Sequence, residues 1–172
     1  MNTNTKAFRE GFRDGIPIGL GYLAVSFSLG ISAKQAGLTP LQGFVTSFLE
    51  NASAGEYIAF TLIGAGATYI ELCLMTIIAN ARYLLMSCAM SQRFSPDTPM
   101  IHRFLVAFDL TDELFGIAIG RPGYLNPYYS YGAFLVALPG WSIGTAAGVI
   151  AGNMLPDDIV KALSVSLFGM FL

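Results

Sequence analysis

The segment ENASAGE, residues 50–56, places two carboxylates inside an otherwise apolar stretch of the chain. Glu50 and Glu56 are six positions apart, which is about 240° around an ideal helix, so on one unbroken helix they would point in different directions. We therefore expect the helix to break at Ser53, Ala54 and Gly55. A break exposes backbone N–H and C=O groups, and at membrane depth these are tolerated only beside protein or water.

Exposed backbone groups at a helix break suit a zwitterionic ligand. The N-terminus of the second half-helix can bind a carboxylate, while carbonyl groups and a glutamate can bind an ammonium group. The alternative is that Glu50 lies near a membrane surface and that the segment is simply two short helices. We predict that this segment binds substrate through Glu50, Asn51, Ser53, Ala54, Gly55 and Glu56.

A second polar motif, NARYLLMS at residues 80–87, interrupts another apolar segment. Arg82 could pair with a membrane carboxylate, or it could hold the carboxylate of a substrate through its bidentate guanidinium. The alternative is an arginine that extends to the membrane surface. We predict that Asn80 and Arg82 belong to the substrate site.

A third motif, FDLTDELFG, spaces Asp109, Asp112 and Glu113 at i, i+3 and i+4, which places them on one face of a single helix. The alternative is that Asp109 is an N-cap, with the other two acids in the favourable first turn. The apolar flanks put these acids at membrane depth, where ionisable groups are costly and mark function. We predict that the three acids couple transport to protons.

The charge balance supports this prediction. Five carboxylates in these motifs face one arginine, and so large an uncompensated charge cannot stay ionised at membrane depth. Some of these acids must therefore be protonated or paired with a cation.

The elements that position these motifs are expected to be transmembrane helices. Of the 172 residues, 54% are hydrophobic and 12% are charged, against roughly 25% charged in a soluble domain. The composition predicts an all-α, polytopic transmembrane bundle that forms a single domain over residues 1–172. Its candidate segments are 16–36, 41–67 (broken), 69–90, 103–119, 131–154 and 159–172.

Two glycine patterns predict close helix packing. One is Gly11, Gly15 and Gly19, and the other is Gly140, Gly144, Gly148 and Gly152. Such faces fit a compact bundle or a contact with another subunit equally well. A loose echo between the segments that begin at Ile16 and Leu138 suggests an inverted repeat of the transporter type. Its second broken segment would lie beyond Leu172, and the apolar end of the chain suggests that the chain continues there.

Other function classes find no support in the sequence. The charges are dispersed and the net charge is −2, so we expect no nucleic-acid partner. No hydrolase, nucleotide-binding or metal motif is present, and Cys73 and Cys88 lack metal-ligand spacing. We therefore expect no enzyme activity, no cofactor and no metal. Lys6, Arg9 and Arg13 predict a cytoplasmic N-terminus.

Four motifs, in this order, resemble the AzlC-type branched-chain amino-acid permeases: FREGFRDGIPIGLGY, SAGEYIAF, NARYLLMSCAMSQR and TDELF. The resemblance covers essentially the whole chain. It implies an efflux permease for branched-chain amino acids in the bacterial inner membrane, with a small AzlD-type membrane subunit as partner. Glu56 departs from the family motif, which commonly has Gln at this position. The alternative function is a structural or assembly subunit of a hetero-oligomeric transporter, without a substrate site of its own.

Overall fold

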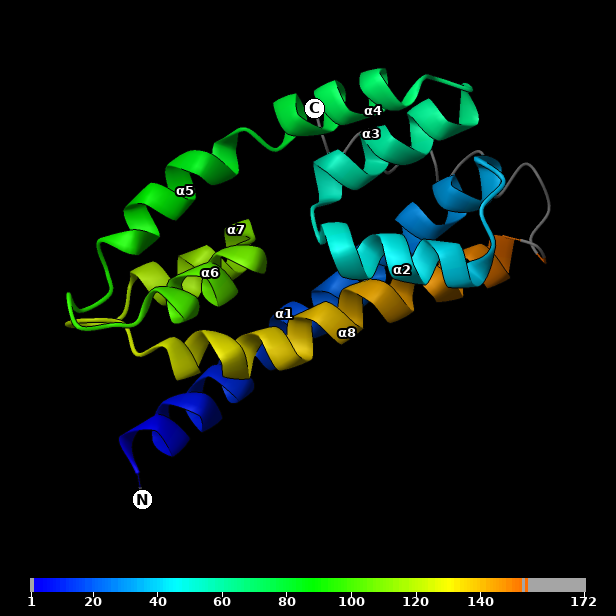
Figure 1. The fold of residues 1–172 in the computed structure, drawn as a ribbon. Helices are drawn as coiled ribbons and strands as arrows, with labels where there is room; N and C mark the ends of the chain where they lie inside the picture. Colours follow the sequence, from blue (N-terminus) through cyan, green and yellow to red (C-terminus); the bar gives the residue numbers. More distant parts are fainter. Residues whose placement is uncertain (1, 153, 155–172) are drawn as a thin grey trace. The chain divides into compact units, whose positions relative to one another are not determined.

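The computed structural model describes residues 2–152 and 154, which form helices and no strand (Figure 1). This confirms the predicted all-α membrane bundle. The chain divides into two compact units, and each unit is assembled from two stretches of sequence. Unit 1 comprises Met1–Leu20 and Ala81–Leu138, and unit 2 comprises Gly21–Asn80 and Pro139–Leu172.

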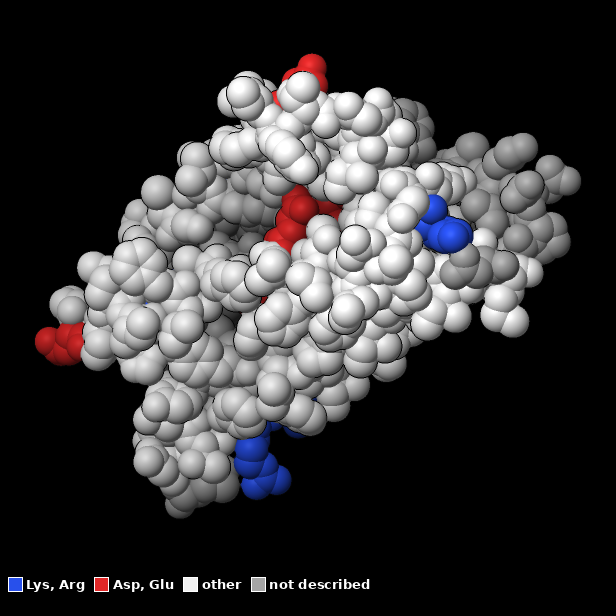
Figure 2. All heavy atoms as spheres, turned by 45° about the vertical axis from the view of Figure 1, so that its right-hand side comes forward, with Lys and Arg blue, Asp and Glu red and all other residues white. Residues whose placement is uncertain are grey.

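Two long helices contribute to both units. Helices α1 (Thr3–Gln35) and α8 (Pro127–Gly152) are each long and apolar enough to cross a membrane. Among the described residues, helices α4 (Tyr69–Ala79) and α5 (Arg82–Ser91) add a third candidate span if they form one broken crossing. Figure 2 shows a face of the molecule on which most side chains are uncharged. These features fit a protein whose outer surface contacts lipid.

Unit 1 contains the first part of α1, helices α5, α6 (Met100–Phe108) and α7 (Asp112–Ile119), and the first part of α8. Its apolar core is formed by side chains that are almost fully buried: Met90, Phe94, Val106, Leu110, Ala118, Leu125 and Tyr129.

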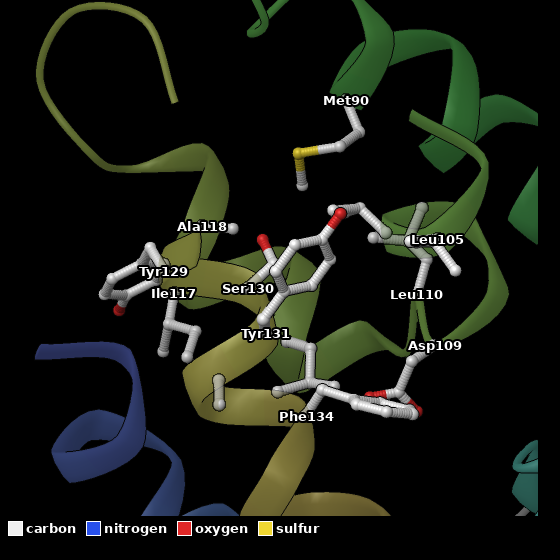
Figure 3. A pocket seen from close by; sticks show the side chains of 13 residues that line it. Met90, Leu105, Asp109, Leu110, Ile117, Ala118, Tyr129, Ser130, Tyr131 and Phe134 are labelled. Atoms are coloured by element: carbon white, nitrogen blue, oxygen red, sulfur yellow. The ribbon is translucent and has the colours of Figure 1, made fainter. Parts of the chain in front are cut away.

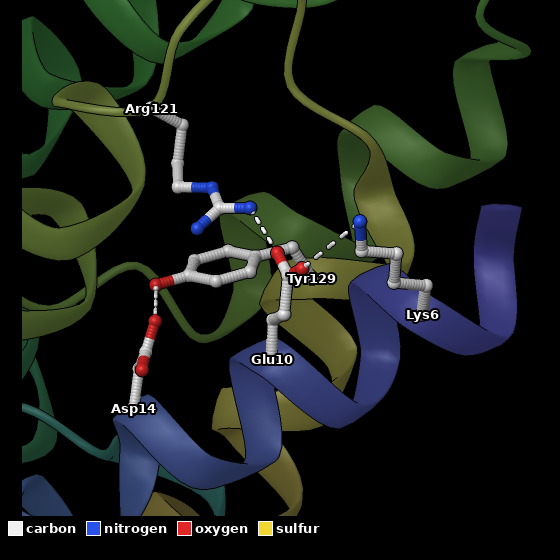
Figure 4. Close-up of polar contacts among 5 residues, drawn as sticks. All are labelled: Lys6, Glu10, Asp14, Arg121 and Tyr129. Carbon is white, nitrogen blue, oxygen red and sulfur yellow. Dashed lines mark hydrogen bonds and ion pairs between the residues drawn. The ribbon is translucent and has the colours of Figure 1, made fainter.

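A polar cluster lies at one edge of unit 1 (Figure 4). The Arg121 guanidinium pairs with Glu10 and lies 4.4 Å from the centre of the Tyr129 ring, and the Tyr129 hydroxyl donates to Asp14 at 2.9 Å. The cluster ties the start of α1 to the loop that precedes α8.

Unit 2 contains α2 (Pro40–Glu50), α3 (Ser53–Gly64) and α4, together with the remaining parts of α1 and α8. Helix α2 begins one residue before the predicted segment 41–67, because Thr39 caps it, Pro40 occupies its first turn and Gln42 completes a capping box. Helix α4 begins in the same way, with Thr68 and Glu71. Glu71 is therefore an exposed cap residue.

The predicted glycine faces bring α1 and α8 into backbone contact in each unit. In unit 2, a Cβ atom on Gly30 would lie 2.8 Å from Gly148 Cα, and one on Gly148 would lie 2.9 Å from Gly30 Cα. No side chain fits in so small a separation. In unit 1, a Cβ on Gly15 would lie 2.8 Å from Ala133 Cα. Of the two uses that the sequence left open, these contacts are packing within the chain.

The same contacts show that the two helices run parallel. Phe27 faces Gly148 and Lys34 faces Gly152, so α1 and α8 run in the same direction through unit 2. Inverted repeats relate segments of opposite direction across an axis in the membrane plane. The predicted inverted relation between the segments that begin at Ile16 and Leu138 is therefore wrong.

Two predicted segments are interrupted where the sequence suggested continuity. Segment 69–90 breaks at Asn80 and Ala81, and segment 103–119 breaks at residues 109–111. Segment 41–67 is broken as predicted, but at Asn51 and Ala52, so Ser53, Ala54 and Gly55 form the first turn of α3. The predicted segment 159–172 lies outside the described residues.

Candidate functional site

The break between α2 and α3 is built from two residues with unlike backbone conformations. Asn51 ends α2 in the left-handed region (φ 43°, ψ 40°), where asparagine is tolerated, and its N–H donates to the Ser47 carbonyl at 3.0 Å. Ala52 is extended and carries no side-chain cap for α3. The N–H groups of Ser53, Ala54 and Gly55 have no partner within the helix, which gives this end of α3 a partial positive charge.

Two polar side chains cover this turn of α3 at Gly55. A Cβ atom on Gly55 would collide with the Glu50 carboxylate and with the Asn80 amide, whose Oδ1 would lie 2.7 Å away. Asn80 is a hydrogen-bonding neighbour of the Glu50 carboxyl, and no other described residue hydrogen-bonds to the buried Glu50 Oε1 or Asn80 Oδ1. Glu50 precedes one helix break and Asn80 begins another, so two breaks meet over one glycine. The sequence assigned both residues to one site, and unit 2 does bring them together.

Glu56 lies one turn into α3 and is fully buried. Its Oε2 accepts from Trp141 Nε1 at 2.6 Å, and its Oε1 accepts from the Ser47 hydroxyl. Thr145 Oγ1 lies 3.5 Å from Oε1 and 2.7 Å from Ser47 Oγ. Helices α2, α3 and α8 are thus joined by one carboxyl group.

The network around Glu56 is one that sequence reasoning found only in part. Ser47, Trp141 and Thr145 were not predicted as site residues, yet all three are buried and contact Glu56. One signal was available, because the single tryptophan and two hydroxyl side chains lie in apolar helices that also carry glycine faces. The Trp141 ring packs edge-on against Tyr22, with centroids 5.1 Å apart.

In unit 1, Arg82 forms an ion pair with Asp112, with Nη2 2.8 Å from Oδ2. Each side chain remains about half exposed, at 48% and 46%. The sequence left open whether Arg82 pairs with a carboxylate of the protein or with that of a substrate, and the structure contains a pair with a carboxylate of the protein. Glu113 is exposed beside Asp112 in the first turn of α7, whose cap is Thr111.

Asp109 does not share a helix face with Asp112 and Glu113, so that prediction was wrong. The chain leaves α6 at Asp109 and starts α7 at Asp112, because Thr111 accepts from the Leu114 N–H and begins a new helix. The alternative with Asp109 as the N-cap was also wrong, since Asp109 is the C-cap of α6.

Asp109 is buried, and it lines a small cavity in unit 1 (Figure 3). The cavity measures about 20 Å³, which is room for roughly one water molecule. Its walls are mostly apolar, with Ser130 and Tyr131 as further polar residues. The Tyr131 hydroxyl lies 2.7 Å from His102 Nδ1. A cavity of this size cannot hold an amino acid.

Two helices long enough to span a membrane, together with short helices that break beside carboxylates and amides, fit a membrane transport protein. A sequence model of the AzlC family, described as AzlC protein, matches residues 17–155. The chain belongs to the AzlC family, and it is a transport-related membrane protein.

Individual relatives agree with this assignment. An uncharacterized membrane protein of Archaeoglobus fulgidus is 29% identical over 167 residues, which cover 96% of this chain and 73% of the relative. The inner membrane protein YgaZ of Escherichia coli is 28% identical, over 86% of this chain and 62% of the relative. The branched-chain amino acid transport protein AzlC of Bacillus subtilis is 26% identical, over 94% of this chain and 66% of the relative. No solved structure matches the chain.

Proposed function

We propose that this protein is a permease subunit that exports branched-chain or related hydrophobic amino acids by secondary, proton-coupled transport. The observation that carries the proposal is the polar cradle over Gly55, where Glu50 and Asn80 meet at the uncapped start of α3. The name of the Bacillus subtilis relative, a branched-chain amino acid transport protein, supports the substrate class.

In this proposal the substrate carboxylate binds the N–H groups of Ser53, Ala54 and Gly55. A helix N-terminus favours an anion at this place. The substrate ammonium group pairs with Glu50, and the amides of Asn51 and Asn80 donate or accept around it. A ligand with both charges can pair with the buried Glu50 carboxyl and with the helix end at the same time.

The acids of unit 1 serve charge balance and proton transfer in the same proposal. Arg82 neutralises Asp112, so this pair balances charge and carries no net charge of its own. Asp109, which is buried beside a cavity of the size of a water molecule, is the proposed proton-transfer group of unit 1, with Glu113 as the second. We further propose an AzlD-type membrane subunit as partner, a bacterial inner-membrane location and a cytoplasmic N-terminus.

The test is amino-acid export by cells that lack this gene. We expect the deletion to slow the export of leucine, isoleucine and valine, and the full-length gene to restore it when an AzlD-type partner gene is present. Lysine export is the matched control and should not change. Normal export of all three branched-chain amino acids by the deletion strain would contradict the proposal. Restoration by the partner gene alone would favour an assembly role for this chain.

A further inference from the structure

We propose that Glu56 carries the coupled proton at the substrate site of unit 2, and that its proton and the ammonium group of the substrate occupy the site at the α2–α3 break alternately. This inference rests on the proposed function and assigns its coupling step to a residue. It makes the protein an exchanger that imports one proton for each amino acid that it exports.

Glu56 lies in buried surroundings that include a second carboxyl group. The side chain is fully buried, and none of the ion pairs among the described residues includes it. Its neighbours on α2 are Ser47 and Glu50, and Glu50 acts on it electrostatically. Helix α8 contributes the uncharged Trp141 and Thr145. Two carboxylates this close, without a cation, cannot both stay charged in a buried site.

The hydrogen bonds around Glu56 accommodate either protonation state of its carboxyl group. When Glu56 is ionised, Ser47 and Trp141 donate to its two oxygens. When Glu56 carries a proton on Oε1, that proton can be donated to Ser47 Oγ, Ser47 can donate to Thr145 Oγ1, and Thr145 donates to the Trp141 carbonyl at 3.3 Å. Only hydroxyl rotations separate the two arrangements.

A carboxyl group that served structure alone would not need both arrangements. A glutamine at this position reproduces the protonated one, since its amide can donate to Ser47 while its oxygen accepts from Trp141. A glutamate adds a single capability to this network, which is the release of the proton.

The charge of Glu50, Glu56 and the bound ammonium group is the same with and without substrate. In the empty site Glu50 is charged and Glu56 is protonated, so the two groups together carry one negative charge. When the substrate ammonium pairs with Glu50, the Glu56 O–H bond breaks, the electron pair stays on the oxygen and the proton leaves to water. Glu50, Glu56 and the ammonium group then also carry one negative charge, and the positive end of α3 partly offsets the substrate carboxylate. The site therefore holds either the proton or the ammonium, which is the condition for exchange.

The experiment measures protons released when L-leucine binds to the purified full-length protein, with its partner subunit, in weakly buffered detergent with a pH indicator. By linkage, wild type should release about one proton per leucine bound. Glu56→Gln should bind leucine and release none, because the proton carrier is gone while the network stays satisfied. Glu71→Gln is the matched control, an exposed acid that caps α4 outside the site, and should release protons as wild type does.

The outcomes separate this inference from the proposed function. If wild type binds no leucine, isoleucine or valine, the proposed function fails. If leucine binds but releases no proton, or if Glu56→Gln still releases one, the inference is overturned while the proposed function stands.

A second variant, Thr145→Val, keeps the Glu56 carboxyl group and removes the hydroxyl that accepts from Ser47 when Glu56 is protonated. We expect leucine–leucine exchange in proteoliposomes to stay within about twofold of wild type, and export driven by a pH gradient to fall by at least fivefold. Unchanged gradient-driven export by this variant would contradict a role for the Thr145 hydroxyl in the protonation of Glu56.

Discussion

The chain breaks its helices twice between acidic residues, and the two breaks are built differently. At the α2–α3 break Glu50 precedes the gap and Glu56 follows it, and the acid that follows is the fully buried one. At the α6–α7 break Asp109 precedes the gap and Asp112 follows it, and here the acid that precedes is buried. The acid after the second gap is half exposed and paired with Arg82.

The caps differ as well. Thr111 caps α7 with its own hydroxyl, whereas Ala52 leaves the start of α3 without a side-chain cap. The second break therefore caps the helix that follows it, and the first leaves the start of α3 uncapped beside the buried oxygens of Glu50 and Asn80. The contrast teaches that a break with acids is the better candidate site where the helix that follows it has no side-chain cap.

The largest expected difference between the breaks is in stability when the buried acid is truncated. Glu56→Ala removes the acceptor of Trp141 and Ser47 and should lower the free energy of unfolding by about 2–4 kcal/mol. Asp109→Ala borders a cavity that can admit water and should cost about 1 kcal/mol. Unfolding in mixed detergent micelles measures both. Glu56→Gln is the control and should stay near wild type, and equal losses for the two alanine variants would remove the contrast.

A matched pair of glycines separates ligand binding from folding. Gly55→Ala places a methyl group against the ends of the Glu50 and Asn80 side chains, which can move aside, so stability should change little. Leucine affinity should fall about tenfold, or 1.4 kcal/mol, because the cradle is displaced. Gly116→Ala on α7 meets open space and should change neither quantity. Wild-type leucine affinity in Gly55→Ala would move the site elsewhere.

Exchanging the caps tests the same contrast at smaller scale. Ala52→Ser supplies the missing cap and should stabilise the protein by about 0.5–1 kcal/mol while weakening leucine binding, because the hydroxyl competes for the helix N–H groups. Thr111→Ala should cost a similar amount and leave leucine binding unchanged. Thermal unfolding with and without leucine gives both quantities. Tighter leucine binding by Ala52→Ser would argue against a carboxylate at this helix end.

The smallest expected effect concerns the ion pair of unit 1. Because Arg82 and Asp112 are each about half exposed, their coupling in a double-mutant cycle of Arg82→Gln and Asp112→Asn should be about 0.2–1 kcal/mol. Unfolding free energies of the four proteins measure it. A coupling of several kcal/mol would show that the pair is shielded from water. Asp112 would then be a buried acid like Glu56, and the two breaks would not differ in this respect.

The sequence predicted much of this molecule because its signals are local. Apolar length predicted membrane helices, and the spacing of Glu50 and Glu56 required a break. The position of that break was missed by two residues, because Asn51 tolerates a left-handed backbone and the small residues after it continue as helix.

The rest depended on contacts between segments distant in sequence. Trp141 and Thr145 lie about 90 positions from Glu56, and no periodicity links them. The sequence predicted a carboxylate as one possible partner of Arg82, but the structure was needed to identify that partner as Asp112. The α6–α7 break was missed because its cap, Thr111, is a residue type that also occurs within helices, and apolar residues continue on both sides.

The most direct test of the central claim is binding of leucine and two analogues to wild type and Glu50→Gln. Isocaproate lacks the ammonium group and leucinol lacks the carboxylate. Wild type should prefer leucine to either analogue by at least about tenfold. Glu50→Gln should bind leucine no better than isocaproate, because the partner of the ammonium group is gone. A Glu50→Gln protein that keeps the wild-type preference for leucine over isocaproate would contradict an amino-acid site at the α2–α3 break.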